Sequence, residues 1–185
     1  EFAGEVATVA KEVYRVGKEA AIKAYKIIGR TAAQVAKGMK EVYNATAKEV
    51  ARLLKKYNYA IREITAGLES AYLHGAAAAA LILKEIGFAA NQVADTLNRA
   101  YDVTAHSLAS FLKYANYKVA EVAAGIHRVF RQTKDSLAVV LKGADYAVKE
   151  VATAVRTTFN LVSEQARAQL GQALKLANFA VADVS

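Results

Sequence analysis

Cysteine, proline and tryptophan do not occur in this 185-residue chain, and methionine occurs once. The lack of cysteine excludes disulfides, thiolate zinc sites, iron–sulfur clusters and cysteine nucleophiles. The lack of proline removes a common helix breaker, and apolar residues rarely alternate with polar ones in the way that strands require. With 55% apolar residues the chain is able to bury a core. We therefore predict an all-α fold.

Long hydrophobic runs are also lacking. The longest run, AAAAALIL at residues 76–83, is far shorter than the roughly 20 residues that span a bilayer, so we expect no transmembrane helix. The first residues, EFAGEVATVAKEV, lack the basic segment, the apolar segment and the cleavage site of a signal peptide. The localisation of the protein is left open by these features.

Motifs for catalysis or cofactor binding are missing as well. The three histidines, His74, His106 and His127, are separated by 32 and 21 residues, which is not a zinc-ligand spacing. There is no phosphate-binding glycine loop and no nucleophile elbow. Regularly spaced glutamates are 29 residues or more apart, too far to form a catalytic carboxylate pair within one helix. We expect no enzymatic activity, no cofactor or metal, and no small-molecule substrate.

What the sequence contains instead is a 29-residue repeat. One repeat position is β-branched, a second is aromatic, and a third is an apolar residue followed by lysine. The first two columns are Val6, Val35, Ile64, Val93, Val122 and Val151, and Tyr14, Tyr43, Tyr72, Tyr101, Phe130 and Phe159. Repeats begin near residues 3, 32, 61, 90, 119 and 148, a four-residue insertion near 162–166 reads as one extra helical turn, and a partial seventh repeat occupies 181–185. We predict a single repeat array over residues 1–185.

Residues between these columns predict helix ends. Gly and Asn adopt the left-handed conformation that closes a helix C-terminus, and Asp tolerates it. One column contains only these residue types: Gly29, Asn58, Gly87, Asn116, Asp145 and, after the insertion, Asn178. The other junction carries the N-cap residues Gly17, Thr46, Gly75, Thr104 and Thr133. Glu5, Gln34, Glu63, Gln92, Glu121 and Glu150 fall in the first turn of the second helix type, where a carboxylate suits the helix dipole.

Two architectures share this periodicity. Twenty-nine residues are almost eight helical turns, so the repeat alone permits one continuous rod. The cap residues favour two helices of about 10 to 12 residues per repeat, and helices this short need neighbours to bury their apolar faces. We predict about twelve helices in a right-handed or gently curved superhelical α-solenoid. The small residues Gly38, Gly67 and Gly125 suit close helix packing, the alternative being a groove for a ligand.

The strings LKEIGFAANQVADTLNRAY and LKGADYAVKEVATAVRTTFN resemble tandem helical repeats of the form LKxxGYxxxxVAxxLKxxFN. Such repeats occur in large bacterial proteins, many of them secreted. The resemblance covers nearly the whole chain and implies a helical-repeat architecture, with secretion or membership of a larger secreted protein as an expectation. It implies no chemistry for particular residues.

The most regular polar feature is a row of lysines, each in the last turn of a predicted helix. The lysine row consists of Lys26, Lys55, Lys84, Lys113, Lys142 and Lys175. A cation there complements the helix C-terminus and aids solubility, whereas the functional alternative is a row that binds an anionic polymer or membrane surface. The net charge of +8 is concentrated in residues 1–60, which hold 12 of the 25 Lys/Arg and 6 of the 17 Asp/Glu.

Three hypotheses of function follow from the sequence. The leading one is a non-enzymatic repeat scaffold for protein binding, spacing or self-assembly, with a protein partner or self-association through the repeat ends. The second is a basic surface that binds nucleic acid or anionic lipid. The third is a membrane-active protein whose amphipathic helices open onto an interface, which requires almost every helix to leave its packing partners together.

Overall fold

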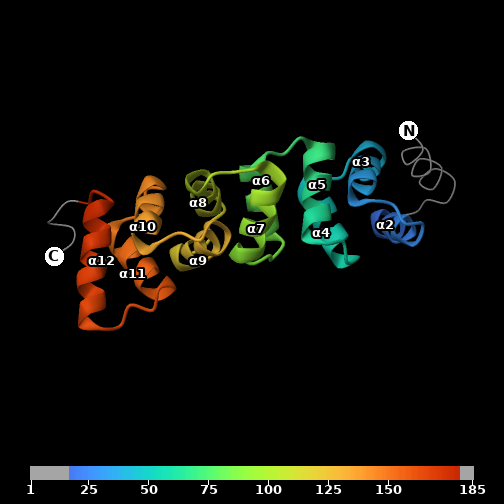
Figure 1. Ribbon diagram of the computed structural model, residues 1–185. Coiled ribbons are helices and arrows are strands. Elements are labelled where there is room, and N and C mark those ends of the chain that lie inside the picture. Colours follow the sequence, from blue (N-terminus) through green and yellow to red (C-terminus); the bar gives the residue numbers. More distant parts are fainter. Residues whose placement is uncertain (1–16, 180–185) are drawn as a thin grey trace. The chain divides into compact units, whose positions relative to one another are not determined.

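All regular structure is α-helical in residues 17–179, the part of the chain that the computed structural model describes (Figure 1). The helices are α2 (Lys18–Ile27), α3 (Ala32–Tyr43), α4 (Ala47–Lys56), α5 (Ile61–Tyr72), α6 (Ala76–Glu85), α7 (Ala90–Tyr101), α8 (Ala105–Tyr114), α9 (Val119–Phe130), α10 (Lys134–Gly143), α11 (Val148–Thr158) and α12 (Glu164–Leu176). The predicted all-α stack of short helices is confirmed. The predictions for Glu5, Val6, Tyr14 and the partial seventh repeat lie outside the described residues.

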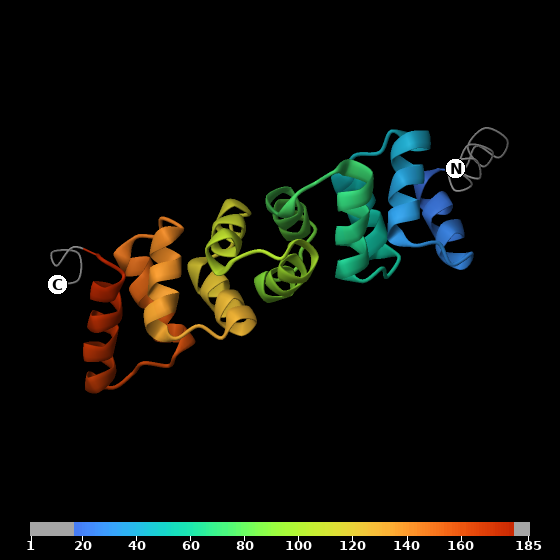
Figure 2. The same cartoon turned by 45° about the horizontal axis from the view of Figure 1, so that its top comes forward.

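The chain divides into two compact units, residues 1–87 and 88–185. The first contains α2 to α6 and the second contains α7 to α12, and both are built from the same alternation of helices. Within each unit a helix contacts its sequence neighbour and also the equivalent helix of the next repeat, as α3 contacts α5 and α9 contacts α11 (Figure 2). A single array that continues across residue 87 stays a prediction.

Even-numbered helices end where the sequence places the left-handed caps. The φ angles there are 73° at Gly29, 59° at Asn58, 84° at Gly87, 63° at Asn116, 59° at Asp145 and 62° at Asn178. At one of these ends the Asn116 amide donates to the Lys113 carbonyl at 2.8 Å, and the Tyr117 amide donates to the Leu112 carbonyl at 3.1 Å. This is the Schellman pattern, which stops the helix and turns the chain. A continuous helical rod is therefore excluded for the described residues.

Odd-numbered helices also end on left-handed residues, which the sequence pattern does not predict. These residues are Asn44, Leu73, Asp102, Arg131 and Asn160, with φ between 46° and 57°. Leucine and arginine seldom adopt this conformation because Cβ crowds the following carbonyl oxygen. Leu73 is 86% exposed, so no packing of its side chain compensates for the strained backbone. The residue type at Leu73 therefore gives no signal for the helix end that the structure has there.

Most helix starts follow one of two patterns. Before α3, α4, α8 and α10 a threonine side chain accepts the amide of the third helical residue, as Thr46 does from Glu49, and the Glu49 carboxylate accepts the Thr46 amide at 2.9 Å. Before α5, α7, α9 and α11 the third residue makes only this reverse bond: the Ala60 amide donates to Glu63 at 2.7 Å and the Ala89 amide donates to Gln92 at 3.1 Å. An amide oxygen accepts this bond as a carboxylate does, which explains why the column contains both Glu and Gln.

In each unit the core is made of aliphatic side chains, and the odd-numbered helices of the unit approach one another closely across it. The β-branched column is fully buried from Val35 to Val151. A Cβ atom at Gly67 would lie 3.1 Å from the Ala32 carbonyl oxygen, and one at Gly125 would lie 3.2 Å from Ala94 Cβ. Both glycines are thus places of tight helix contact, as the sequence predicts.

The insertion differs from the predicted extra helical turn. The N-cap of α12 is Ser163, one residue later than a 29-residue spacing from Thr133 would place it. Helix α12 has 13 residues where α10 has 10. Helix α11 ends at Thr158 and is one residue shorter than α9, so the insertion lengthens the connection by two residues and the following helix by three.

Candidate functional site

Four members of the lysine row, Lys26, Lys55, Lys113 and Lys142, contact the next repeat. Lys55 Nζ donates to the carbonyl oxygens of Ile86 at 2.6 Å and Gly87 at 3.2 Å. Lys113 Nζ donates in the same way to Ala144 at 2.8 Å and Asp145 at 2.7 Å. These carbonyls end the equivalent helix one repeat later, where they have no donor within their own helix and carry partial negative charge.

Aromatic rings complete these contacts. Lys26 Nζ lies 3.9 Å from the centre of the Tyr59 ring, and Lys113 Nζ lies 4.7 Å from the centre of the Tyr146 ring. Lys142 Nζ lies 4.8 Å from the Phe179 ring centre and also donates to the Asn178 carbonyl. Each ring follows a left-handed cap residue, so a cation–π contact joins the lysine of one repeat to the cap of the next. We name the arrangement of lysine, cap carbonyls and ring the lysine clasp.

Tyrosine hydroxyls in the same rings reach in the opposite direction along the chain. Tyr59 Oη donates to the Arg30 carbonyl at 3.0 Å, and Tyr117 Oη donates to the Phe88 carbonyl at 2.7 Å. Burial raises the pKa of Tyr117 far above its ordinary value. Tyr146 differs, because its hydroxyl oxygen is buried and has no hydrogen-bond partner in the described part of the chain. Burial raises its pKa to about 12.

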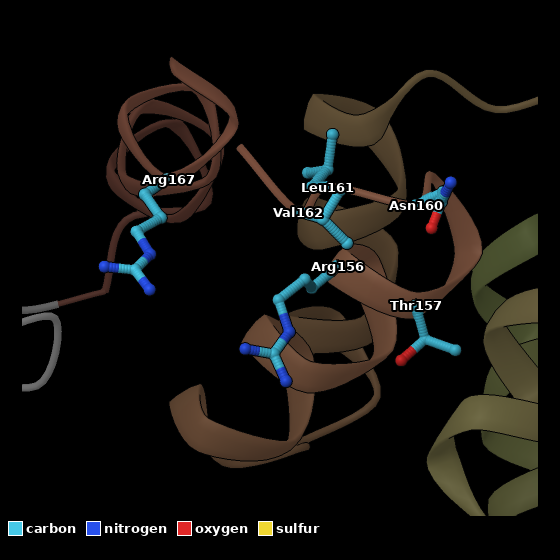
Figure 3. A pocket seen from close by; sticks show the side chains of 6 residues that line it. All are labelled: Arg156, Thr157, Asn160, Leu161, Val162 and Arg167. Carbon is cyan, nitrogen blue, oxygen red and sulfur yellow. The ribbon is translucent and has the colours of Figure 1, made fainter. Parts of the chain in front are cut away.

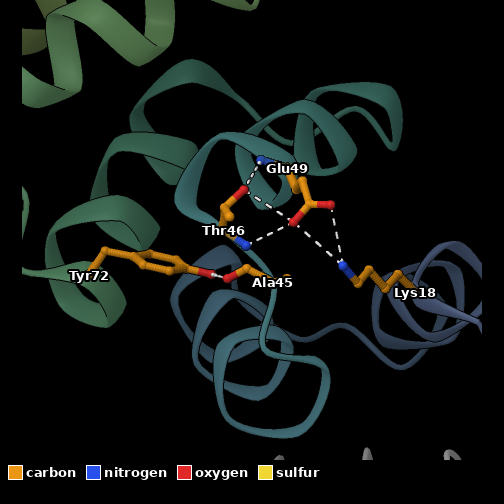
Figure 4. Close-up of polar contacts among 5 residues, drawn as sticks. All are labelled: Lys18, Ala45, Thr46, Glu49 and Tyr72. Atoms are coloured by element: carbon orange, nitrogen blue, oxygen red, sulfur yellow. Dashed lines mark hydrogen bonds and ion pairs between the residues drawn. The ribbon is translucent and has the colours of Figure 1, made fainter.

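A second set of contacts joins the odd-numbered helices at their C-terminal ends. Lys40 Nζ donates to the Ala71 carbonyl at 2.7 Å and lies 5.3 Å from the centre of the Tyr72 ring. Tyr72 Oη in turn donates to the Ala45 carbonyl at 2.7 Å (Figure 4). His127 occupies the equivalent repeat position to Lys40, and its ring meets Phe159 edge-on with 4.8 Å between centroids. A polar side chain over an aromatic ring therefore recurs on this side of the stack too.

Carboxylates take part in the repeat-to-repeat contacts of the first unit. Lys18 Nζ lies 3.3 Å from Glu49 Oε1 (Figure 4), and the Thr46 amide, followed by the Lys18 ammonium, lowers the pKa of Glu49. Lys56 pairs with Glu19 at 2.8 Å, and Lys48 pairs with Glu85 at 3.0 Å. Lys48 occupies the repeat position of Glu19 and Glu85 that of Lys56, so the second pair has the two charges the other way round. These side chains are well exposed, so each pair contributes little to stability.

Ammonium groups of the lysine row are therefore hydrogen-bonded to the protein's own carbonyl oxygens at Lys55 and Lys113. An ammonium group has three donors, and carbonyl oxygens take two of them at Lys55 and Lys113. Lys84 and Lys175 lie in the last turns of α6 and α12. The sequence predicts that the lysines of the row lie at helix ends. It does not predict the partners of Lys55, Lys113 and Lys142, which are 31 to 36 residues away along the chain.

The histidines are spread through the structure. The His74 ring stacks on Tyr72 with 6.0 Å between centroids, and His127 Nδ1 lies 2.8 Å from the Gln132 carbonyl oxygen. His106 lies against Gly143, where an added Cβ would come within 2.5 Å of its ring. Between residues 17 and 179, no three His, Asp or Glu side chains gather as metal ligands would. No helix within that range combines the length and the apolar character needed to cross a membrane.

A cavity of about 450 Å³ lies at the insertion (Figure 3). It is lined by Arg156, Thr157, Asn160, Leu161, Val162 and Arg167. Sequence reasoning missed this cavity, although the break in the repeat marks its place. Arg156 of α11 and Arg167 of the neighbouring α12 are both among its lining residues.

Comparison with models of known protein families, with curated proteins and with solved structures found no match to this chain.

Proposed function

We propose that this chain is a non-enzymatic helical-repeat scaffold in which the recurring charged residues hold successive repeats together. The observation that carries the proposal is the lysine clasp, in which Lys55 and Lys113 each donate to two carbonyl oxygens of the next repeat. Such contacts fix the spacing between repeats, which is what a scaffold for protein binding or spacing requires.

The alternative use of the row, as a binding surface for nucleic acid or anionic lipid, has less support. Close contact with phosphate requires ammonium donors, and most donors of Lys55 and Lys113 already bind carbonyl oxygens. Binding a phosphate chain along the row would break the clasps and expose helix ends. The positive charge remains and gives a long-range attraction that salt screens.

A binding experiment with matched charge changes separates the two functions. The variant Lys55→Met/Lys113→Met removes one clasp from each unit, and Lys37→Met/Lys149→Met removes the same charge from two exposed lysines outside the clasps. Each protein is titrated with double-stranded DNA and with phosphatidylserine vesicles at about 50 and about 200 mM salt.

The scaffold proposal predicts that the two double variants bind DNA and vesicles equally weakly, and that only Lys55→Met/Lys113→Met lowers the thermal midpoint. Salt-sensitive binding that is lost in Lys55→Met/Lys113→Met and kept in the control variant, with equal thermal midpoints, would overturn it in favour of an anion-binding row. Vesicle leakage caused by the wild-type chain would favour the membrane-active alternative.

A further inference from the structure

At the start of α12 the insertion places an exposed arginine at a helix position that is buried in the earlier even-numbered helices. The fourth residue of each earlier even-numbered helix of the described chain is apolar and buried: Ala21, Val50, Ala79, Leu108 and Leu137. In α12 this residue is Arg167, which is exposed, and Ala166 is buried in its place. Three additional helical residues rotate the buried face by about 300°, which is equivalent to about 60° in the other direction. The first turn of α12 therefore presents a charged side chain beside α11.

A second arginine reaches the same opening from the last turn of α11. Arg156 occupies the repeat position of Lys40 and His127, the two residues whose side chains meet an aromatic ring one repeat later. Arg156 and Arg167 instead line the cavity at the insertion, and Figure 3 shows them extending from their separate helices. Neither guanidinium forms an ion pair or hydrogen bond with any side chain between residues 17 and 179.

The remaining lining residues define what the cavity recognises. The Asn160 amide adds a neutral donor at the left-handed end of α11. The Thr157 hydroxyl donates to the Thr153 carbonyl at 2.8 Å, so its oxygen is only an acceptor. Leu161 and Val162 supply an apolar wall, and Val162 is 81% exposed. The cavity thus combines two permanent positive charges, one amide and an apolar surface.

We propose that this cavity binds a small organic phosphate monoester. Guanidinium groups bind phosphate oxygens with two parallel hydrogen bonds, and two of them match the two negative charges of a monoester near neutral pH. The organic part of the ligand lies on Leu161 and Val162. A volume of about 450 Å³ falls within the usual range for small-molecule sites. This site goes beyond the scaffold function and does not depend on the lysine clasps.

The test is a calorimetric titration of the whole chain with phenyl phosphate, inorganic phosphate and benzyl alcohol. We expect saturable binding that is tightest for phenyl phosphate, because only this probe carries both the dianion and an apolar body. Arg156→Gln and Arg167→Gln should each weaken that binding by about tenfold. The matched control is Arg128→Gln, which changes an exposed arginine of α9 and should leave the affinity within about twofold.

Circular dichroism melting checks that the exposed substitutions leave the fold intact. Absence of saturable binding by the wild-type chain would overturn the proposal, and so would equal weakening in Arg128→Gln and Arg156→Gln. Equal affinity for inorganic phosphate and phenyl phosphate would contradict the assignment to a monoester. None of these outcomes bears on the scaffold proposal, because the clasps and the cavity share no residue.

Discussion

Lys113 Nζ lies 2.7 Å from the carbonyl oxygen of Asp145, the left-handed residue that ends the equivalent helix one repeat later. The contact links two columns of the sequence that look independent. A left-handed cap stops the helix and leaves carbonyl oxygens without donors, and the lysine of the preceding repeat supplies those donors. The hydrogen bond from Lys113 to Asp145 therefore both satisfies a helix end and holds two successive repeats together.

Tyr117 and Tyr146 occupy the same repeat position but differ in hydrogen bonding. Tyr117 Oη donates to the Phe88 carbonyl, whereas Tyr146 Oη is buried without a partner. We expect Tyr117→Phe to lower the free energy of unfolding by about 1 kcal/mol. Tyr146→Phe should leave it unchanged or raise it, because the variant removes a buried polar atom that has lost its contact with water. Urea denaturation measures both, and an equal loss in the two variants would contradict the structure.

Leu73 is an unfavourable residue for the conformation that it adopts. Its φ is 57° and its side chain is 86% exposed, while Asn44 fills the equivalent position one repeat earlier. Leu73→Asn should therefore raise the free energy of unfolding by about 1 kcal/mol, and the reverse change Asn44→Leu should lower it by a similar amount. Thermal denaturation of the two variants provides the measurement. Stabilisation by both, or by neither, would show that backbone strain does not decide these helix ends.

Two glycines in helices should respond differently to alanine. An added Cβ at Gly171 has no heavy atom within 4 Å, so Gly171→Ala should stabilise the chain by about 1 kcal/mol through helix propensity alone. At Gly67 the same atom would lie 3.1 Å from the Ala32 carbonyl oxygen, which belongs to a neighbouring helix and moves little. Gly67→Ala should lose that gain, and Gly67→Val should destabilise the chain clearly. Chemical denaturation that ranks Gly67→Ala level with Gly171→Ala would rule out the tight approach of α3 and α5.

Alkaline pH should weaken the fold through the buried tyrosines. Burial raises the pKa of Tyr72 to about 12, with a smaller contribution from Glu49. The unfolded chain has a tyrosine pKa near 10, so it loses the proton first. The stability contributed by Tyr72 is complete below pH about 10 and is lost as the pH rises through about 12. Urea midpoints at several pH values should fall less steeply for Tyr72→Phe than for the wild type, and parallel curves would contradict this assignment.

The sequence predicts those features of the fold that depend on local chemistry. Asn116 and Thr104 mark a helix end and a helix start because each satisfies backbone groups within a few residues of itself. Gly67 predicts close helix packing because it recurs at a position of small residues in the repeat. Each of these features depends on the type of one residue at a fixed position of the repeat, so it can be predicted once the 29-residue period is known.

Features that depend on the stack are not accessible in this way. Leu73 gives no sign that it ends a helix, because leucine seldom adopts the left-handed conformation that it has here. The partners of Lys113 lie 31 and 32 residues ahead, and only the geometry of neighbouring repeats brings them within reach. The cavity between Arg156 and Arg167 depends on how four inserted residues divide between loop and helix, which the sequence pattern leaves open.

The most direct test of the lysine clasp is urea denaturation of Lys113→Met beside Lys149→Met, which removes an exposed lysine of the same unit. Lys113→Met removes two charge-assisted hydrogen bonds and a cation–π contact, partly exposed to water, so we expect a loss of about 1 to 2 kcal/mol in the free energy of unfolding. Lys149→Met should change it by less than about 0.5 kcal/mol. Amide exchange should also accelerate at Asp145 and Tyr146 in Lys113→Met alone. If the two variants have equal stability and equal exchange rates, the lysine row does not hold the repeats together.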